Sequence, residues 1–446
     1  MASTPTSTGN RWGIALAGVI VMICLGTVYS WSIFTNSLIA GFNWSQQGAT
    51  TPFELAIFFL GLGAVFGGRW QDRVGPRTVT IVGVILWGLG VALAGLGTQA
   101  IGQWWLYLTY GVIGGFGNGM AYVTPVAMVT KWFPDRRGLG SGLVVMGFGL
   151  GAFFYNQIVP KIAIFASAAK ASGAYITARD AAIKAGTVFD PSTYQLSHAQ
   201  VAGVMSIFVV SGVVFIVLGG LCAFLLKNPP AAYSVAGATA SAAAHAPSFT
   251  PGEVLKMPQF YGLWLLLFLN VTAGIMIIAN AVPIIIELTK VSAAVAAPAY
   301  GFLAIFNGLG RFFWGSVSDR IGRGLTYTVM YLIQVVVFFF LGGFHSLSLV
   351  AVAYAIVLLC YGGGFGVMPS FNADFFGTKF LGANYGMILT AWGLAGVVGP
   401  FIGARIKDAT GSFHGALIPV AIMLLVAAVI PFVVKKPTNL PREAAA

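Results

Sequence analysis

The sequence predicts an all-α membrane protein whose twelve transmembrane helices form two sets of six, and three observations support this fold class. The chain of 446 residues is 58% hydrophobic and only 8% charged, whereas a soluble domain carries roughly 25% charged residues because its surface faces water. Twelve apolar runs are long enough to cross a bilayer, which takes about 20 helical residues. A pattern of prolines, glycines and charges also occurs twice along the chain.

The twelve apolar runs define the expected spans and the segments between them. They lie near residues 12–36, 51–70, 78–98, 103–130, 138–160, 201–226, 259–288, 294–317, 324–344, 347–370, 381–404 and 412–434. Residues 161–200 are too polar to span, so we expect a surface helix or lid there. Residues 227–258 are rich in Pro, Ala and Ser, as linkers are. We therefore predict an N-terminal half (1–226) with an extracytoplasmic insertion at 161–200, a cytoplasmic linker (227–258) and a C-terminal half (259–446).

The two halves contain the same landmarks in the same register. Four pairs of residues are each separated by 244 positions, namely Pro125 and Pro369, Gly138 and Gly382, Gly142 and Gly386, and Gly149 and Gly393. The segment QDRVGPR after the second span is likewise repeated as SDRIGR after the eighth. Tandem six-helix halves favour a substrate site at their interface and alternating access by rocking of the halves.

The net charge of +12 reflects membrane topology rather than nucleic-acid binding, because the basic residues lie in short loops between apolar runs. With both termini in the cytoplasm, fifteen Lys and Arg residues lie on the cytoplasmic face. Seven lie on the other face, four of them within residues 161–200. This positive-inside bias predicts cytoplasmic termini. We expect a multi-pass protein of a bacterial inner membrane, functional as a monomer in the lipid bilayer, with no nucleic-acid partner.

The spans contain no paired carboxylates, no His/Cys spacing typical of a metal site and no nucleophile–base pair. We therefore expect no enzyme activity, no metal and no cofactor. A non-transporting membrane sensor is the alternative from another functional class, but it would need a signalling domain, for which the terminal segments are too short.

One charged residue lies inside a span. Arg311 precedes Ser318, at the cytoplasmic end of the eighth span, by seven residues, which places it roughly 10 Å inside the membrane. An arginine at that depth needs a wet cavity or a partner, and the nearest polar neighbour on its helix face is the neutral Asn307. An unpaired guanidinium can hold a carboxylate through two hydrogen bonds. The alternatives are pairing with a distant acid such as Glu54 or Glu287, or snorkelling to the cytoplasm.

The repeated segments QDRVGPR (71–77) and SDRIGR (318–323) resemble the loop signature of the major facilitator superfamily. This resemblance implies the major facilitator fold and a cytoplasmic gate latched by charged residues. Asp72 and Asp319 would cap or bridge a neighbouring helix end. The arginines that would pair with them are Arg73, Arg77, Arg320 and Arg323. The alternative is a solvated turn whose charges only set topology.

A closer resemblance runs through most of the chain. The segments VYSWSIF (28–34), KWFPDRRGLGSG (131–142), MGFGLG (146–151), MPQFY (257–261), NGLGRFFWGSVSDRIGR (307–323), MPSFNADFFG (368–377) and NYG (384–386) are similar to the oxalate/formate antiporter family, which is akin to the monocarboxylate transporters. The resemblance implies that Arg311 binds the substrate carboxylate. It also places Tyr29, Tyr122 and Tyr361 on the cavity wall, and Asn118 and Asn307 could offer amide donors there.

The departures from this family bear on the substrate. Trp392 stands where the oxalate carrier has a second cation, a Lys, and Phe148 and Phe365 stand where Tyr would be expected. A pocket with one positive charge favours a monoanion, because the second carboxylate of a dianion would have no counter-ion in a site of low dielectric constant. We therefore predict a transporter of small monocarboxylates such as lactate or pyruvate. An oxalate/formate-type antiporter is the alternative.

The sequence is compatible with more than one mode of coupling. Symport with a proton would make movement of a monoanion electroneutral, but the eukaryotic monocarboxylate carriers have an Asp one turn before the Arg of span eight, where this chain has Asn307. Glu54 and Glu287 are the candidate proton carriers. The substrate could also enter with its own proton, and exchange of one anion for another is the competing mechanism.

Overall fold

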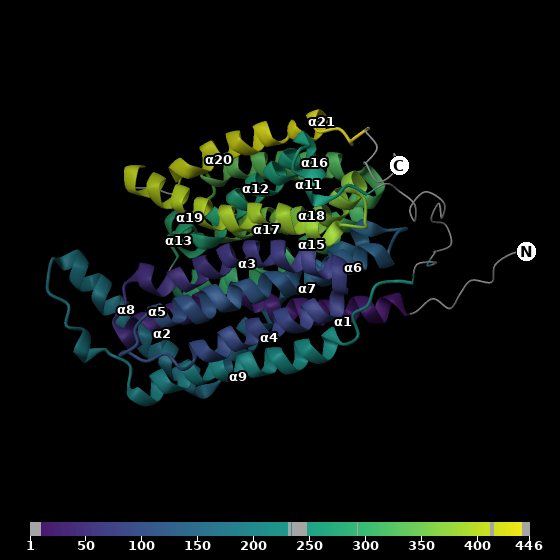
Figure 1. Ribbon diagram of the computed structural model, residues 1–446. Coiled ribbons are helices and arrows are strands. Elements are labelled where there is room, and N and C mark those ends of the chain that lie inside the picture. The colour runs from purple at the N-terminus through teal and green to yellow at the C-terminus, as the bar shows by residue number, and fades with distance from the viewer. Residues whose placement is uncertain (1–9, 231–232, 234–247, 292, 411–413, 439–446) are drawn as a thin grey trace, which may run out of the picture.

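A computed structural model describes residues 10–230, 233, 248–291, 293–410 and 414–438, and in these residues the chain is all α-helical (Figure 1). Within this part of the chain, eleven helices are long and apolar enough to cross a membrane. The remaining span, which is the eighth along the chain, is formed by α14 (Ala293–Leu303) and α15 (Ile305–Ile321), which are separated at Ala304. The predicted twelve-helix fold is therefore confirmed. Half of the predicted linker, residues 231–232 and 234–247, lies outside the described residues.

The first half of the chain forms six membrane-length segments. Their helices are α1 (Arg11–Gly26), η1 (Thr27–Ser30) and α2 (Ser32–Phe42); α3 (Gln46–Val74); α4 (Pro76–Ala94); α5 (Trp104–Leu106), η2 (Tyr107–Gly114) and α6 (Gly115–Trp132); α7 (Arg137–Ile158); and α9 (His198–Ala223). η3 (Val159–Lys161) leads into the predicted insertion, which contains α8 (Ala163–Ala185) and η4 (Pro191–Thr193). α8 projects from one end of the bundle and packs on α2 through the Ser172–Ser37 and Tyr175–Asn43 hydrogen bonds (Figure 1).

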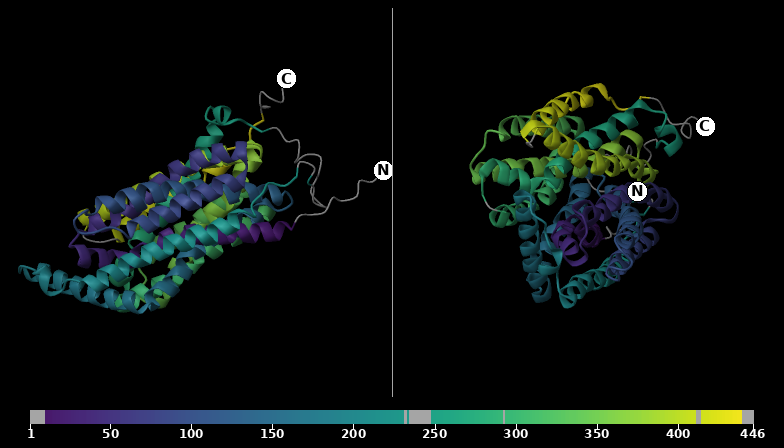
Figure 2. Two further views of the ribbon diagram at one scale, coloured as in Figure 1. Left: turned by 60° about the horizontal axis from the view of Figure 1, so that its bottom comes forward. Right: turned by 90° about the vertical axis from the view of Figure 1, so that its left-hand side faces the viewer.

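The second half repeats this arrangement. Its helices are α11 (Pro251–Val254); α12 (Pro258–Ala279) and α13 (Ala281–Thr289); α14 and α15; α16 (Arg323–Leu341); α17 (Leu347–Phe376); α18 (Leu381–Ile388) and α19 (Thr390–Thr410); and α20 (His414–Ala427) and α21 (Ile430–Val433). The two halves lie side by side as two groups of roughly parallel helices, which the end-on view separates clearly (Figure 2). We call the end of the bundle where α1 begins and α21 ends the terminal end.

The two groups meet along two helix pairs, in which glycines allow close approach. α7 packs on α15, and a Cβ at Gly138 would overlap the Gly315 carbonyl. α3 packs on α18 and α19, and a Cβ at Gly68 would overlap the Gly382 carbonyl. Small residues are the usual means of bringing membrane helices together. Gly138 and Gly382, one of the predicted repeat pairs, therefore occupy equivalent positions in the two contacts.

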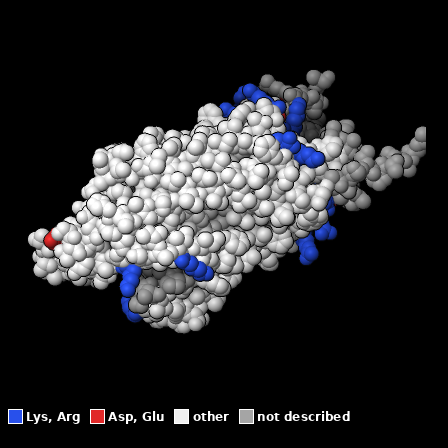
Figure 3. Space-filling view, turned by 90° about the horizontal axis from the view of Figure 1, so that it is seen from below, with Lys and Arg blue, Asp and Glu red and all other residues white. Residues whose placement is uncertain are grey.

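Large apolar side chains cover the outside of the bundle, among them Phe66, Leu221, Phe339 and Phe432. Figure 3 shows a broad band without charged residues between clusters of Lys and Arg that lie toward the ends of the molecule. An uncharged apolar band is what a lipid-facing surface requires. The chain is thus a multi-pass membrane protein.

Candidate functional site

The charged residue that the sequence analysis singled out lies in the interior of the bundle. Arg311 is on α15, and its side chain is fully buried. Its Nε donates a hydrogen bond to Asn307 Oδ1 (3.2 Å), and its Nη1 donates to the Val145 carbonyl on α7 (3.5 Å). Nη2 has no hydrogen-bond partner. Among the described residues, Arg311 forms no ion pair.

Glycines from both halves fix the backbone of Arg311. A Cβ at Gly142 on α7 would lie 2.5 Å from the Arg311 carbonyl oxygen, and a Cβ at Gly366 on α17 would also overlap that carbonyl. The backbone of α15 is therefore held between two helices that approach it only because these positions lack side chains. This packing places the guanidinium at the interface of the two helix groups.

Two aromatic rings flank the guanidinium. Its central carbon lies 5.3 Å from the ring centroid of Phe148 on α7 and 4.8 Å from that of Phe365 on α17. Such cation–π contacts stabilise a positive charge without neutralising it. A Cβ at Gly26 would overlap the Phe148 carbonyl, so the close contact between α1 and α7 helps to position this ring. The two rings therefore contact the guanidinium without supplying a counter-ion.

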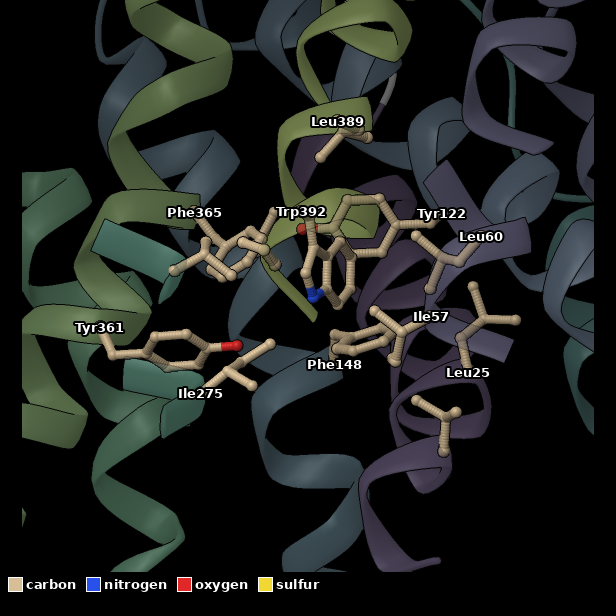
Figure 4. Packing of buried hydrophobic residues seen from close by; sticks show 14 of the residues in the cluster. Leu25, Ile57, Leu60, Tyr122, Phe148, Ile275, Tyr361, Phe365, Leu389 and Trp392 are labelled. Atoms are coloured by element: carbon tan, nitrogen blue, oxygen red, sulfur yellow. The ribbon is translucent and has the colours of Figure 1, made fainter. Parts of the chain in front are cut away.

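Trp392 is the centre of an aromatic cluster formed by Tyr29, Tyr122, Phe148, Tyr361, Phe365 and Trp392. Its ring centroid lies 4.8 Å from Phe365, 5.3 Å from Tyr122, 5.4 Å from Phe148 and 6.2 Å from Tyr29. Figure 4 shows Trp392 between Phe365 and Tyr122, with the Tyr361 hydroxyl pointing toward the middle of the cluster. The predicted aromatic residues of both halves therefore lie together around Arg311.

Several polar atoms in this cluster are buried without a hydrogen-bond partner. They are Arg311 Nη2, the Tyr122 hydroxyl and Trp392 Nε1. The Tyr29 and Tyr361 hydroxyls form a hydrogen bond of 3.0 Å across the two halves. The Tyr29 hydroxyl also lies close to both Arg311 and Trp392, and the Tyr122 hydroxyl lies close to Arg311. Buried polar groups are nearly always paired in proteins, so these convergent donors are suited to an anionic ligand.

The two candidate amides occupy different places. Asn307 contacts Arg311 directly and accepts its Nε hydrogen bond. Asn118 on α6 donates to the Leu25 carbonyl on α1 (2.9 Å), which fastens these two helices together, while its Oδ1 has no partner. The structure thus brings Asn307 into contact with the guanidinium and uses the Asn118 amide for packing within the N-terminal half.

The two repeated aspartates cap helices of the opposite half at the terminal end. Asp319, near the end of α15, accepts hydrogen bonds from the backbone nitrogens of Gly138 (2.9 Å) and Leu139 (2.8 Å) at the start of α7. Asp72, near the end of α3, accepts from those of Gly382 (3.2 Å) and Ala383 (2.8 Å) at the start of α18. A carboxylate at a helix N-terminus satisfies free N–H groups and interacts favourably with the helix dipole.

The charges around the two capping aspartates differ. Arg323 pairs with Asp319 (2.7 Å) and with Asp374 at the end of α17 (3.0 Å), and Asp374 also pairs with Arg137 (2.9 Å). Asp72 instead has the Lys131 ammonium near it, without an ion pair. The three other predicted gate arginines, Arg73, Arg77 and Arg320, are exposed and form no ion pair within the described part of the chain.

The candidate proton carriers lie outside the aromatic cluster. Glu54 is in the third turn of α3 and accepts a hydrogen bond from Gln47 Nε2 (3.0 Å). Glu287 is partly buried near the end of α13. The structure does not bring either carboxylate into the site around Arg311.

Comparison with known proteins identifies the family. The model of the Major Facilitator Superfamily matches residues 14–373 and 308–446. The chain is a member of the major facilitator superfamily.

Similar proteins include the oxalate:formate antiporter of Oxalobacter formigenes, with 28% identity over 431 residues that cover 96% of this chain and 92% of that protein. Apicoplast pyruvate carrier 1 of Toxoplasma gondii is 27% identical over 464 residues, which cover 87% of this chain and 82% of that carrier. The superfamily transporter FucP, solved in its outward conformation, has a TM-score of 0.69 at 16% identity and covers 95% of this chain and 99% of its own. The resemblance to the oxalate/formate antiporter family is thereby confirmed.

In this major facilitator protein, sequence reasoning missed some residues that the structure places in the gate and next to the site. Asp374 on α17 pairs with Arg137 on α7 and with Arg323 on α16, so these ion pairs connect the three helices. Tyr385 on α18 has a buried hydroxyl near that of Tyr122. Asp374 could have been recognised from the sequence as a candidate gate residue, because it is a charged residue near the end of a 30-residue apolar helix. Tyr385 could not, since aromatic residues are common throughout the chain.

Proposed function

We propose that this protein is a secondary transporter that carries small monocarboxylates such as lactate and pyruvate by alternating access. The observation that carries the proposal is the fully buried Arg311 guanidinium, which has no acidic partner among the described residues and has a free Nη2. A carboxylate would accept hydrogen bonds from the guanidinium and neutralise it in a site of low dielectric constant.

The number of charges supports a monoanion as substrate. The aromatic cluster surrounds Arg311 with apolar ring faces and neutral donors, and it contributes no second cation. A monocarboxylate would leave this site neutral, whereas a dianion would leave one buried negative charge, which is strongly unfavourable. The similar apicoplast carrier is named for pyruvate, which is a monocarboxylate.

In a transporter that works by alternating access, the charged residues at the terminal end would form a gate. We propose that this end faces the cytoplasm of a bacterium, as the positive-inside bias indicates, with the chain organised as two halves joined by a cytoplasmic linker. The helix caps of Asp72 and Asp319 and the Arg137–Asp374 ion pair would then hold the halves together on the cytoplasmic side. Substrate release to the cytoplasm would require these contacts to separate.

Transport measurements with an Arg311 variant test this proposal. The purified protein in proteoliposomes should take up labelled lactate and pyruvate, and Arg311→Gln should lose at least about a hundredfold of the uptake efficiency, because charge-assisted hydrogen bonds are lost. Arg405→Gln is the matched control, since Arg405 is exposed on α19 outside the cluster. Equal uptake by Arg311→Gln and the parent would refute the carboxylate-binding role.

We further propose that the transported anion is accompanied by a proton, with Glu54 or Glu287 as the carrier. An inward proton gradient should then accelerate uptake by the parent protein, and Glu54→Gln or Glu287→Gln should lose that acceleration while exchange of internal for external substrate persists. Uptake that depends on internal anion and not on the pH gradient would instead identify an exchanger.

An oxalate/formate-type antiporter is the second candidate, because the Oxalobacter formigenes antiporter is 28% identical over nearly the whole chain. Trp392 distinguishes the two candidates. If the missing cation determines the preference for monoanions, Trp392→Lys should increase oxalate uptake relative to lactate uptake by about tenfold or more. Robust oxalate exchange by the parent protein would favour the antiporter.

A further inference from the structure

The donors in the site are divided between two sides of the Trp392 ring. On α17, Tyr361 lies one helical turn before Phe365, on the side away from the terminal end, and its hydroxyl bonds to that of Tyr29. The Tyr122 hydroxyl, by contrast, lies close to that of Tyr385 on α18, four residues from Leu381, where α18 begins at the terminal end. Arg311 lies close to both Tyr29 and Tyr122.

Trp392 Nε1 is a donor without a hydrogen-bond partner on the side of Tyr29 and Tyr361. The whole side chain is buried, and Nε1 has no hydrogen-bond partner, although the Tyr29 hydroxyl is near it. An indole nitrogen can only donate, and it carries no charge. It therefore suits a neutral acceptor oxygen, and a buried indole N–H normally has such a partner.

We propose that Trp392 Nε1, together with the Tyr29–Tyr361 hydroxyl pair, binds the oxygen on carbon 2 of a 2-oxo or 2-hydroxy monocarboxylate whose carboxylate is held by Arg311. This inference rests on the proposed function and adds the residue that selects within the substrate class. The tyrosine hydroxyls can donate or accept, so they can bind a ketone or a hydroxyl. The oxygen on carbon 2 is adjacent to the carboxylate, as Tyr29 is adjacent to both Arg311 and Trp392.

The same arrangement disfavours unsubstituted acids. Propionate has the shape of lactate without the hydroxyl, so its binding would leave Trp392 Nε1 buried and unpaired. A site built to hydrogen-bond a substrate oxygen rejects an analogue that lacks it, because the site's own polar groups lose their partner. Trp392 is thus a specificity-determining residue as well as the central ring of the aromatic cluster.

The experiment compares lactate with propionate in proteoliposomes. Unlabelled propionate should inhibit labelled lactate uptake at least about tenfold less effectively than unlabelled lactate does. Trp392→Phe keeps an aromatic ring and removes the N–H, and it should reduce this difference to about threefold or less. Tyr385→Phe is the matched control, because it removes a buried hydroxyl on the other side of the cluster; its discrimination should equal that of the parent.

The outcomes separate the inference from the function on which it rests. Equal inhibition by propionate and lactate in the parent, or unchanged discrimination in Trp392→Phe, would overturn the role of Nε1 while leaving a monocarboxylate transporter. No lactate uptake by the folded parent would instead contradict the proposed function and the inference with it. If Trp392→Phe does not fold, Tyr361→Phe tests the same group of donors and should also lower the discrimination; unchanged discrimination there would overturn the inference.

Discussion

Two arginines on neighbouring segments of the second half, Arg311 and Arg323, lie twelve residues apart and have opposite electrostatic surroundings. Arg323 contacts the carboxylates of Asp319 and Asp374. Arg311 contacts an amide oxygen, a backbone carbonyl and two phenylalanine rings, all of them neutral. The arginine with two carboxylates is partly exposed, and the one without a carboxylate is fully buried.

This contrast indicates that the two arginines have different functions, because folding stability alone would favour a carboxylate beside the buried arginine and not beside the partly exposed one. Burial makes an unpaired charge more unfavourable, so the buried arginine is the one that should have an acid beside it. Proteins retain such unfavourable groups where a ligand completes them. The paired charges near Arg323 connect helices, and we propose that the charge of Arg311 serves to bind a substrate.

Giving Arg311 the kind of partner that Arg323 has should produce the largest effect. In Asn307→Asp, an ionised carboxylate would form an ion pair with the Arg311 guanidinium one helical turn away. Lactate uptake at neutral pH should fall about a hundredfold, since a buried charge pair must be broken before substrate binds. Protonation of the new carboxyl releases the guanidinium, so uptake should recover as the pH is lowered and decrease as it is raised.

Asn307→Ala is the control for that variant, because it removes the amide without adding a charge. It should retain more uptake than Asn307→Asp at neutral pH and should show no new dependence on pH. Initial rates of uptake across a series of matched internal and external pH values provide the measurement. Identical profiles for the two variants would show that an acid at this position does not reach the guanidinium.

Removing the shared acid of the gate should have an intermediate effect. Asp374→Asn leaves Arg137 without its carboxylate and leaves Arg323 with only Asp319. Because the Asp374 side chain is 34% exposed, solvent screens these ion pairs and limits their contribution to the closed gate. We expect the maximal rate of lactate uptake to fall by about threefold to tenfold with little change in apparent affinity. A large loss of affinity would contradict the separation between gate and site.

The smallest expected effect is the difference in maximal uptake rate between variants of the two capping aspartates. Asp319→Asn and Asp72→Asn both weaken a helix cap, but Asp319 also loses its attraction to Arg323. The maximal rate should therefore decrease about twofold more in Asp319→Asn than in Asp72→Asn, since a partly exposed ion pair adds only a fraction of a kcal/mol. Uptake measured at equal amounts of reconstituted protein decides this. A larger defect in Asp72→Asn would indicate that the α3–α18 contact dominates the gate.

The sequence was sufficient for the fold and for the identity of the central charge, for physical reasons. Membrane spans can be predicted because each must satisfy its own backbone and present apolar side chains to lipid. Arg311 stood out because a charge in an apolar run needs an explanation. The register of the two halves was also visible, since Gly138 and Gly382 recur 244 positions apart and both donate to a capping aspartate.

The contacts between helices could not be predicted in the same way. Whether Arg323 or Arg320 faces an acid depends on the rotation of α16 and α15 against α17, which neighbouring residues do not reveal. The breaks in the spans at Ala304 and Leu389 likewise carry no Pro or Gly at the position itself. The orphaned indole nitrogen of Trp392 is a property of the assembled cluster, because its lack of a partner appears only when both halves are in place.

Equilibrium binding of lactate to the purified protein and to Arg311→Gln, measured by calorimetry, tests the central claim without involving the gate or the driving force. We predict binding to the parent and a dissociation constant about a hundredfold or more higher for the variant, because the only buried cation in the described site is removed. Dissociation constants that agree within about twofold, a difference of roughly 0.4 kcal/mol, would contradict it.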